Sequence, residues 1–258
     1  MARPTPQQTT TDSAPAGRAG TIRFGTRARF GILMPSGNSV AEGELAAMVP
    51  ADISLHVTRL RLTGSSPEEL AAMTQDIEGA ASLVADVRPD LIGFHCTAVS
   101  MADADAEADI LARARQASGR EVVATSEAAV AALAALGARR IVLVTPYLDH
   151  IVASEVAFLN RHGIAVTDAF GAGLNTTDEM ARVDPERWHD MTRAHRSTEA
   201  DAYFISCTAI RSLPVVERLE AVLGKPVITS NQVMAWHMLR KAGIPDRPQG
   251  FGRLLGAH

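Results

Sequence analysis

Two cysteines occupy matching places in two similar stretches of this chain. One stretch reads Asp90-Leu-Ile-Gly-Phe-His-Cys96-Thr-Ala and the other Asp201-Ala-Tyr-Phe-Ile-Ser-Cys207-Thr-Ala, and the chain has no further cysteine. A short apolar run after an aspartate is typical of a buried parallel strand, so each thiol is expected at the carboxyl end of a strand, where open α/β sheets bind ligands. Two thiols there could move protons at a carbon atom from opposite faces. Alternatively, one thiol could attack as a nucleophile while the other supplies a proton.

The residues that follow each cysteine could help both reactions. The free backbone N–H groups of Thr97 and Ala98, and of Thr208 and Ala209, could hold a carboxylate or an enolate oxygen. The same helix N-termini are expected to lower the thiol pKa below its usual value of about 8.5. A buried cysteine is more often an inert apolar side chain. The symmetric placement of both cysteines before Thr-Ala favours catalysis over that interpretation.

Four more polar residues fall in predicted loops near the same edge of the sheets: Ser36, Asn38, Tyr147 and Asn175. The two amides could donate to a substrate carboxylate without carrying charge, and the Tyr147 hydroxyl could reach the cleft. Turn formation by the asparagines and packing by the tyrosine are the structural alternatives. His95 should point away from the thiol that follows it, because side chains alternate along a strand. The eight histidines show no metal-ligand spacing, so no metal site is predicted.

The elements that carry these residues are repeated along the chain. Cys207 lies 111 residues after Cys96 (207 − 96), and the same offset joins Arg29 to Arg140. This period is too long for a solenoid unit and indicates a duplicated α/β half. Apolar strand-like runs alternate with helical patterns, which predicts parallel βαβ units. We therefore expect an α/β fold of two similar doubly wound parallel-sheet halves, related by a pseudo-twofold axis, with the active site in the cleft between them.

The same pattern divides the chain into three parts. Residues 1–27 lack an apolar period, which predicts a flexible N-terminal extension. Residues 28–125 together with 240–258 are expected to form the first half, and residues 126–239 the second, so that the C-terminal tail packs onto the first half. Ser39 is expected to cap a helix that ends near Met48, and Ser66-Pro67 to open one long helix.

Composition narrows the choice of partners. The chain has 25 basic and 29 acidic residues, a net charge of −4 and no long run of either sign, which argues against nucleic acid and membrane surfaces as partners. No apolar run approaches the roughly 20 residues of a membrane span, and the first residues lack the apolar core of a secretory signal. We expect a cytoplasmic homo-oligomer with reduced cysteines that acts on a small molecule.

Several of these motifs recur together in one known group of enzymes. They are Pro35-Ser36-Gly37-Asn38-Ser39, Cys96-Thr97, Tyr147 after Thr-Pro, Asn175, Ser206-Cys207-Thr208-Ala209-Ile210-Arg211, and Gly224-Lys-Pro-Val-Ile-Thr-Ser-Asn-Gln232 with Trp236-His237. With them the chain resembles the aspartate/glutamate racemase superfamily, and most of all its maleate cis-trans isomerase branch. The resemblance covers almost everything after Arg29.

The resemblance implies an isomerase that needs no cofactor and no metal. Cys96 would add to the double bond of maleate and give a covalent succinyl-type intermediate that can rotate about its new single bond. Cys207 would supply and recover the proton, and elimination would release fumarate. Asn38, Tyr147 and Asn175 would hold the two carboxylates. Where the isomerases usually carry a second hydroxyl residue, this chain has Gly37.

Three alternatives stay open. The arylmalonate decarboxylases also resemble this chain, at Gly137-Ala-Arg-Arg140, Tyr147-Leu-Asp149, Met180-Ala-Arg-Val-Asp184 and Gly252-Arg-Leu-Leu255. They keep only the thiol that corresponds to Cys207, so the presence of Cys96 counts against decarboxylation. The second alternative is a cofactor-independent racemase of aspartate-like, glutamate-like or hydantoin-like acids. The third is a binding module for small carboxylates, because a fold alone does not establish an activity.

Overall fold

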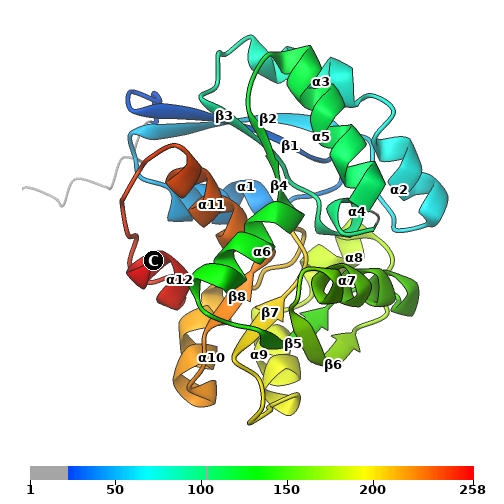
Figure 1. Cartoon of the computed structure of the whole chain (residues 1–258), viewed down its shortest axis with the longest axis vertical. Coiled ribbons are helices and arrows are strands. Elements are labelled where there is room, and N and C mark those ends of the chain that lie inside the picture. The colour runs from blue at the N-terminus through cyan, green and yellow to red at the C-terminus, as the bar shows by residue number, and fades with distance from the viewer. Residues whose placement is uncertain (1–22, 103) are drawn as a thin grey trace, which may run out of the picture.

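Two four-stranded parallel sheets form the framework of the protein. The computed structural model describes residues 23–102 and 104–258. The first sheet has the strand order β2-β1-β3-β4 and the second the order β6-β5-β7-β8, so every strand of the first sheet has a counterpart in the second (Figure 1). The strands are β1 (Ala28–Pro35), β2 (Ile53–Leu60), β3 (Leu91–Phe94), β4 (Val122–Ala124), β5 (Arg140–Thr145), β6 (Ala165–Gly171), β7 (Ala202–Ile205) and β8 (Val227–Thr229). The predicted α/β fold of two similar halves is confirmed.

Helices connect the strands and cover the sheets. They are α1 (Ala41–Met48), α2 (Pro67–Met73), α3 (Ile77–Ala85), α4 (Thr97–Ser100), α5 (Ala104–Ser118), α6 (Thr125–Ala135), α7 (Asp149–Arg161), α8 (Thr177–Arg182), α9 (Pro185–Ala194), α10 (Val216–Leu223), α11 (Ser230–Lys241) and α12 (Gly252–Ala257), with a short 3₁₀ helix at Leu213–Val215. No helix in the described part of the chain is long and apolar enough to cross a membrane.

The aspartate that precedes each cysteine strand fixes the start of the sheet. The Asp90 carboxylate accepts a hydrogen bond from the backbone N–H of Arg29 at 2.8 Å, and the Asp201 carboxylate accepts one from Arg140 at 2.9 Å. These contacts align β3 with β1 and β7 with β5 in the same way. Both cysteine strands are completely buried, as expected for parallel strands covered on both faces.

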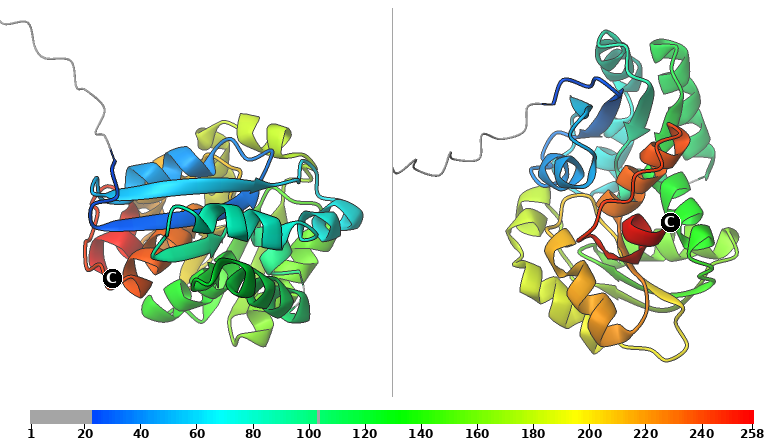
Figure 2. Two further views of the ribbon diagram at one scale, coloured as in Figure 1. Left: turned by 90° about the horizontal axis from the view of Figure 1, so that it is seen from above. Right: turned by 90° about the vertical axis from the view of Figure 1, so that its left-hand side faces the viewer.

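Helix α11 lies where the two halves meet. It contacts α1, α6 and β3 as well as β8, and Figures 1 and 2 show it beside α6 in the middle of the molecule. The C-terminal helix α12 contacts α10, β8 and α11. The Gln232 side-chain amide also donates to the backbone carbonyl of Phe251. Helix α12 therefore packs against elements of the second half, whereas Asp246 of the same tail pairs with Arg27 just before β1 at 2.6 Å. The division of the chain at residues 125 and 240, with the tail assigned to the first half, stays a prediction.

Several helix ends differ from those predicted. Ser39 does not cap α1: the Asn38 side-chain oxygen instead accepts from the N–H groups of Val40 and Ala41 at 2.9 and 3.0 Å. Ser66 does cap α2, in a reciprocal capping box with Glu69. The single long helix predicted there is two helices, α2 and α3, separated at residues 74–76.

The expected N-terminal extension is described only at its end. Residues 1–22 lie outside the described residues. The guanidinium group of Arg23 donates to the carbonyls of Ala46, Val49 and Pro50 at the C-terminus of α1. A cation at this position satisfies free carbonyls and interacts favourably with the helix dipole.

Candidate active site

The two thiols and one phenol are buried and interact electrostatically with one another. Cys96 follows β3 and Cys207 follows β7, and they are 4% and 2% exposed. The Tyr147 hydroxyl, which follows β5, interacts with the Cys207 thiol and lowers its pKa, and it also lies within electrostatic reach of Cys96. The structure thus brings together a cysteine from each half and a tyrosine from the second half.

Burial dominates the ionisation of both thiols. It raises the pKa of Cys96 and of Cys207 to about 12. Hydrogen bonds oppose this effect: the Ala209 N–H donates to the Cys207 sulfur at 3.2 Å, and the Tyr147 hydroxyl and the N–H groups of Ala98 and Val99 also lower the thiol pKa values. Loss of hydration outweighs these donors, so the pKa of each thiol lies above its usual value and not below it, as was expected from the helix N-termini.

Asn38 joins the two halves beside this pocket. It is 1% exposed, and its amide nitrogen donates to the Thr208 hydroxyl at 3.0 Å. Its side-chain oxygen accepts from the Val40 and Ala41 N–H groups at the start of α1, so Asn38 is held in place, and its second amide N–H has no partner among the described residues. On the other side, the hydroxyl of Ser230 accepts from the Thr97 hydroxyl at 2.9 Å and from the backbone N–H of Cys207 at 3.0 Å. Ser230 was missed from the sequence, although it begins a polar run directly after an apolar strand.

A second buried network lies behind the thiols. His95 is fully buried between Thr125 and Asn231, at 3.1 and 2.8 Å, and so points away from Cys96 as predicted. Burial lowers the pKa of His95 to about 4, so the ring is neutral, and its Nε2–H donates to the Asn231 oxygen. The Asn231 amide donates in turn to the Glu44 carboxyl at 2.6 Å, and burial raises the pKa of Glu44 to about 7. This network links β3, α1, α6 and α11.

Glu155 is the second buried carboxyl near the site, and it too was missed from the sequence. It is fully buried, and neither carboxyl oxygen has a hydrogen-bond partner among the described residues. Burial raises its pKa to about 8. The nearby Ser206 hydroxyl lowers the pKa of Glu155. The hydroxyl and the carboxyl do not form a hydrogen bond with good geometry, so both groups are without partners among the described residues. A sequence signal existed: the buried stripe of α7 holds Ile151 and Phe158, and Glu155 interrupts it.

Two predicted substrate-binding side chains lie in the open. Ser36 is exposed, and its hydroxyl pairs with the backbone of Leu62. Asn175 is exposed as well, and its backbone carbonyl accepts from the Ser65 hydroxyl at 2.6 Å. No contact of either side chain with a thiol is recorded in the described residues, so their roles in substrate binding stay predictions.

The glycine at position 37 is explained by its contact with the second half. A Cβ at Gly37 would stand 2.2 Å from the Thr177 hydroxyl oxygen, far inside van der Waals contact. Thr177 also donates its backbone N–H to the carbonyl of Thr63 at 3.1 Å. The hydroxyl group of Thr177, the first residue of α8, therefore occupies the space that a side chain at position 37 would need.

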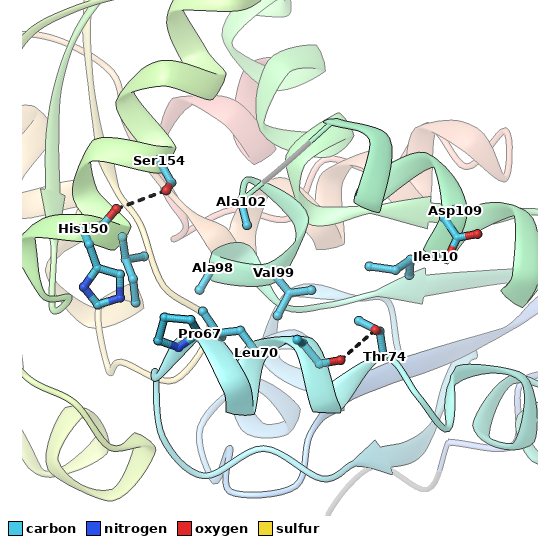
Figure 3. A pocket seen from close by; sticks show the side chains of 12 residues that line it. Pro67, Leu70, Thr74, Ala98, Val99, Ala102, Asp109, Ile110, His150 and Ser154 are labelled. Carbon is cyan, nitrogen blue, oxygen red and sulfur yellow. Dashed lines mark hydrogen bonds between the residues drawn. The ribbon is translucent and has the colours of Figure 1, made fainter.

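A mainly apolar cleft of about 430 Å³ adjoins the Cys96 loop. Figure 3 shows Pro67 and Leu70 of α2 facing Ala98 and Val99 of α4, with His150 at one end. Because α4 begins directly after Cys96, this cleft lies next to the first thiol. In the described residues, no group of three or more His, Cys, Asp or Glu side chains could hold a metal ion.

Comparisons with known proteins agree with this geometry. Residues 30–255 match the family model described as arylmalonate decarboxylase. The maleate isomerase of Nocardia farcinica is 32% identical over 238 residues, which cover 88% of this chain and 95% of that protein. The arylmalonate decarboxylase of Bordetella bronchiseptica is 28% identical, with 88% of this chain and 95% of that protein covered.

One similar solved structure contains a reaction intermediate. It is a cysteine-to-serine variant of the Nocardia farcinica maleate cis-trans isomerase with a covalently bound succinylcysteine intermediate. It superimposes with a TM-score of 0.85 at 29% identity and covers 90% of this chain and 99% of that one. The chain therefore belongs to the arylmalonate decarboxylase family, and the maleate isomerases among its relatives identify it as an isomerase.

Proposed function

We propose that this protein converts maleate into fumarate through a covalent adduct with Cys96. The Cys96 thiolate adds to one alkene carbon, the carbon–carbon π bond breaks, and the neighbouring carbon takes the proton of the Cys207 thiol. The former double bond is now a single bond and can rotate. The Cys207 thiolate then removes a proton from the same carbon, the carbon–sulfur bond breaks, and fumarate leaves with Cys96 again a thiolate. Atoms and charges balance without a cofactor.

The observation that carries this proposal is the buried group of Cys96, Cys207 and Tyr147, whose members interact with one another. A nucleophile on one side of the substrate and an acid on the other suit addition across a double bond. The Tyr147 hydroxyl lowers the pKa of the Cys207 thiol, and the Ala98 and Val99 N–H groups lower that of Cys96, so the two sulfur atoms have different surroundings. That difference favours distinct roles, with Cys207 as the proton carrier. The succinylcysteine intermediate of the similar Nocardia farcinica enzyme is the adduct expected from such an addition.

The substrate carboxylates need donors, and the pocket offers them near both thiols. We assign this role to the free N–H of Asn38, to Tyr147, to Asn175 and Ser36 in the neighbouring loops, and to the backbone N–H groups of residues 97–98 and 208–209. Thr97 and Thr208 are fixed by their bonds to Ser230 and Asn38, so those backbone groups are held in place before the substrate arrives.

Proton NMR of maleate with the reduced protein in D2O tests the proposal. We expect fumarate to appear with wild-type protein, and turnover to fall by several orders of magnitude in Cys96→Ser and in Cys207→Ala, because neither thiol can replace the other. In Cys207→Ser, mass spectrometry should find one maleic acid added to Cys96. A Cys96→Ser variant with full turnover would contradict the covalent mechanism. Deuterium at the α-carbon of aspartate or glutamate would indicate the racemase instead.

A second candidate is decarboxylation of an arylmalonate, which the apolar cleft beside Cys96 favours. Its walls at Pro67, Leu70, Val99 and Ile110 would suit an aromatic or alkyl group better than a carboxylate. Adding an arylmalonate to the same NMR experiment separates the two candidates, because decarboxylation needs only Cys207 as a proton donor. Turnover that survives Cys96→Gly would support this second function.

The cellular location and the assembly are less constrained. A cytoplasmic location and a homo-oligomeric state stay predictions. Light scattering on the purified protein measures the assembly directly.

A further inference from the structure

The carboxyl group of Glu155 is fully buried on α7, whose Ile151 packs in the same core cluster as Tyr147 and Cys207, and the proposed reaction does not use it. It lies on the inner face of α7 between Ile151 and Phe158, and both oxygens lack a partner among the described residues. An ionised carboxylate in such a place is very costly, so the group keeps its proton over a wide pH range. Burial raises the pKa of Glu155 to about 8. At neutral pH it is therefore mainly a neutral acid.

Among the described residues, the titratable groups that interact electrostatically with Glu155 carry no positive charge. They are Cys96 at the end of β3, Tyr147 after β5 and Cys207 after β7, and a negative charge on Glu155 raises the pKa of each of them. Ser206 is the further polar neighbour. The other charged or titratable groups of α7, at its two ends, are exposed: Asp149, His150 and Arg161. Nothing in this set offsets a second negative charge in the pocket.

We propose that Glu155 is a positioning residue that acts through the thiols. While the Glu155 carboxyl is protonated, a thiolate can form at Cys96 or Cys207. When the carboxyl ionises, its negative charge suppresses formation of that thiolate. The inference deepens the proposed function, on which its catalytic meaning rests. Ionisation of Glu155 and ionisation of a thiol each release one proton to solvent. Both leave a negative charge in the same buried region, so each ionisation disfavours the other. A dianionic substrate adds to the same competition. The pocket should therefore work best below about pH 8.

Neutral replacements of Glu155 separate the effect of charge from the effect of shape. Glu155→Gln keeps the shape and hydrogen-bonding capacity without the charge, whereas Glu155→Met keeps only the volume. Glu179→Gln is the matched control, since it removes a carboxylate from the exposed face of α8 while glutamine still completes the capping box with Thr176. For all four proteins, iodoacetamide alkylation of each cysteine would be followed by peptide mass spectrometry from about pH 6 to about pH 10.

We expect the ratio of variant to wild-type alkylation rates to change with pH. It should be near one below about pH 7, where wild-type Glu155 is neutral, and should rise to roughly threefold to tenfold above pH 8 for both Glu155 variants. The Glu179→Gln ratio should stay near one throughout. The wild-type profile alone should flatten above about pH 8 relative to a simple thiol, so the test survives even if both replacements fail to fold.

Two results would overturn the proposal. One is a ratio that does not depend on pH together with a wild-type profile that has no inflection. The other is slower alkylation in both neutral variants at every pH, because the thiols would then need the ionised carboxylate. Maleate turnover against pH is measured separately. If maleate is not converted but the alkylation ratio still rises, the proposed function fails while the role of Glu155 stands.

Discussion

Among single residues, Tyr147 distinguishes one thiol from the other. Cys96 and Cys207 are 111 residues apart, and the same offset relates Ser36 to Tyr147. A small exposed residue of the first half therefore corresponds to a buried aromatic residue of the second. The Tyr147 hydroxyl lowers the pKa of Cys207. Duplicated halves start with equal sites, and this difference gives the two thiols different neighbours.

Tyr147→Phe tests that difference. Removing the hydroxyl takes away a donor that lowers the pKa of Cys207, so the thiolate of Cys207 becomes harder to form. A hydrogen bond to a charged group corresponds to roughly tenfold to hundredfold in rate, and we expect kcat/KM for maleate to fall by that factor. Alkylation of Cys207 should slow more than that of Cys96. Equal slowing of both cysteines would contradict the assignment.

Gly37 allows a second test between the halves. In Gly37→Ala the new methyl group would overlap the Thr177 hydroxyl, which lies 2.2 Å from the Cβ position. We expect a loss of about 1–3 kcal/mol in the free energy of unfolding, measured by urea denaturation. Thr177→Ala removes the overlapping oxygen, so the double variant should be more stable than the sum of the single losses predicts. Strictly additive losses would mean that the backbone moves instead.

Sequence reasoning finds some of these residues and misses others for a physical reason. Cys96, Cys207, Asn38 and Tyr147 all follow strand ends, and the repeat marks the places where loops meet ligands. Glu155 has no repeated partner, and its importance depends on burial that the sequence does not display. Its only signal is a charge in an apolar stripe.

At the level of elements, the eight strands could be predicted because their apolar runs are short and bounded by turn residues. The helix ends could not be predicted, because each helix begins where a side chain reaches the free backbone N–H groups of the first turn, and the sequence does not show which side chain does so. At α1 this is Asn38, which also binds Thr208 across the molecule, and not the adjacent Ser39. Helix α8 was missed for a related reason: its capping box, Thr176 with Glu179, follows a glycine-rich stretch that reads as a loop.

The junction helix α11 carries the polar network of His95, Asn231 and Glu44, whose members are far apart in the chain. In Asn231→Ala the His95 Nε2–H and the Glu44 carboxyl lose their shared partner. Unpaired buried polar groups cost free energy, so we expect a loss of roughly 2–4 kcal/mol in urea unfolding.

A control on the same helix is Lys241→Ala. It removes an exposed ion pair with Glu127 at 3.1 Å, and the expected cost is below about 1 kcal/mol. If Asn231→Ala is no more destabilising than this control, the network does not hold the halves together.

For the whole molecule, duplication explains both what could be predicted and what could not. The offset of 111 residues indicates two equal sheets and places the thiols in one pocket. It says nothing about segments that occur once, and the C-terminal helix is such a segment. Its apolar residues Leu254 and Leu255 are fully buried in a core cluster that contains Ile228 of β8 and also Phe30 of β1. The tail therefore contributes to a core that draws on both sheets, which the repeat could not indicate.

The buried acids and His95 also set how the stability of the whole protein depends on pH. The pKa of Glu155 is raised from 4.5 to about 8 and that of Glu44 to about 7, so the folded state binds more protons than the unfolded chain and stability falls as pH rises through these ranges. The pKa of His95 is lowered from 6.5 to about 4, so its contribution is lost as pH falls below 6.5. Below pH 6.5 the contributions of the two acids and of His95 to the pH dependence of stability have opposite signs. Between pH 6.5 and 8 His95 contributes nothing to that dependence, and only the acids lower the stability as pH rises.

This window gives a prediction for the whole fold. Over pH 6.5 to 8 the free energy of unfolding of the wild-type protein should decrease by roughly 2 kcal/mol because of Glu155. In Glu155→Gln the unfolded and folded states bind equal numbers of protons at this position, so that decrease should disappear, and the variant should gain stability over the wild type as pH rises. Urea unfolding of both proteins at several pH values measures the difference, in which all other titrating groups cancel. Parallel curves would mean that Glu155 ionises as readily in the fold as in the unfolded chain, and the carboxyl would then have to reach water or a cation.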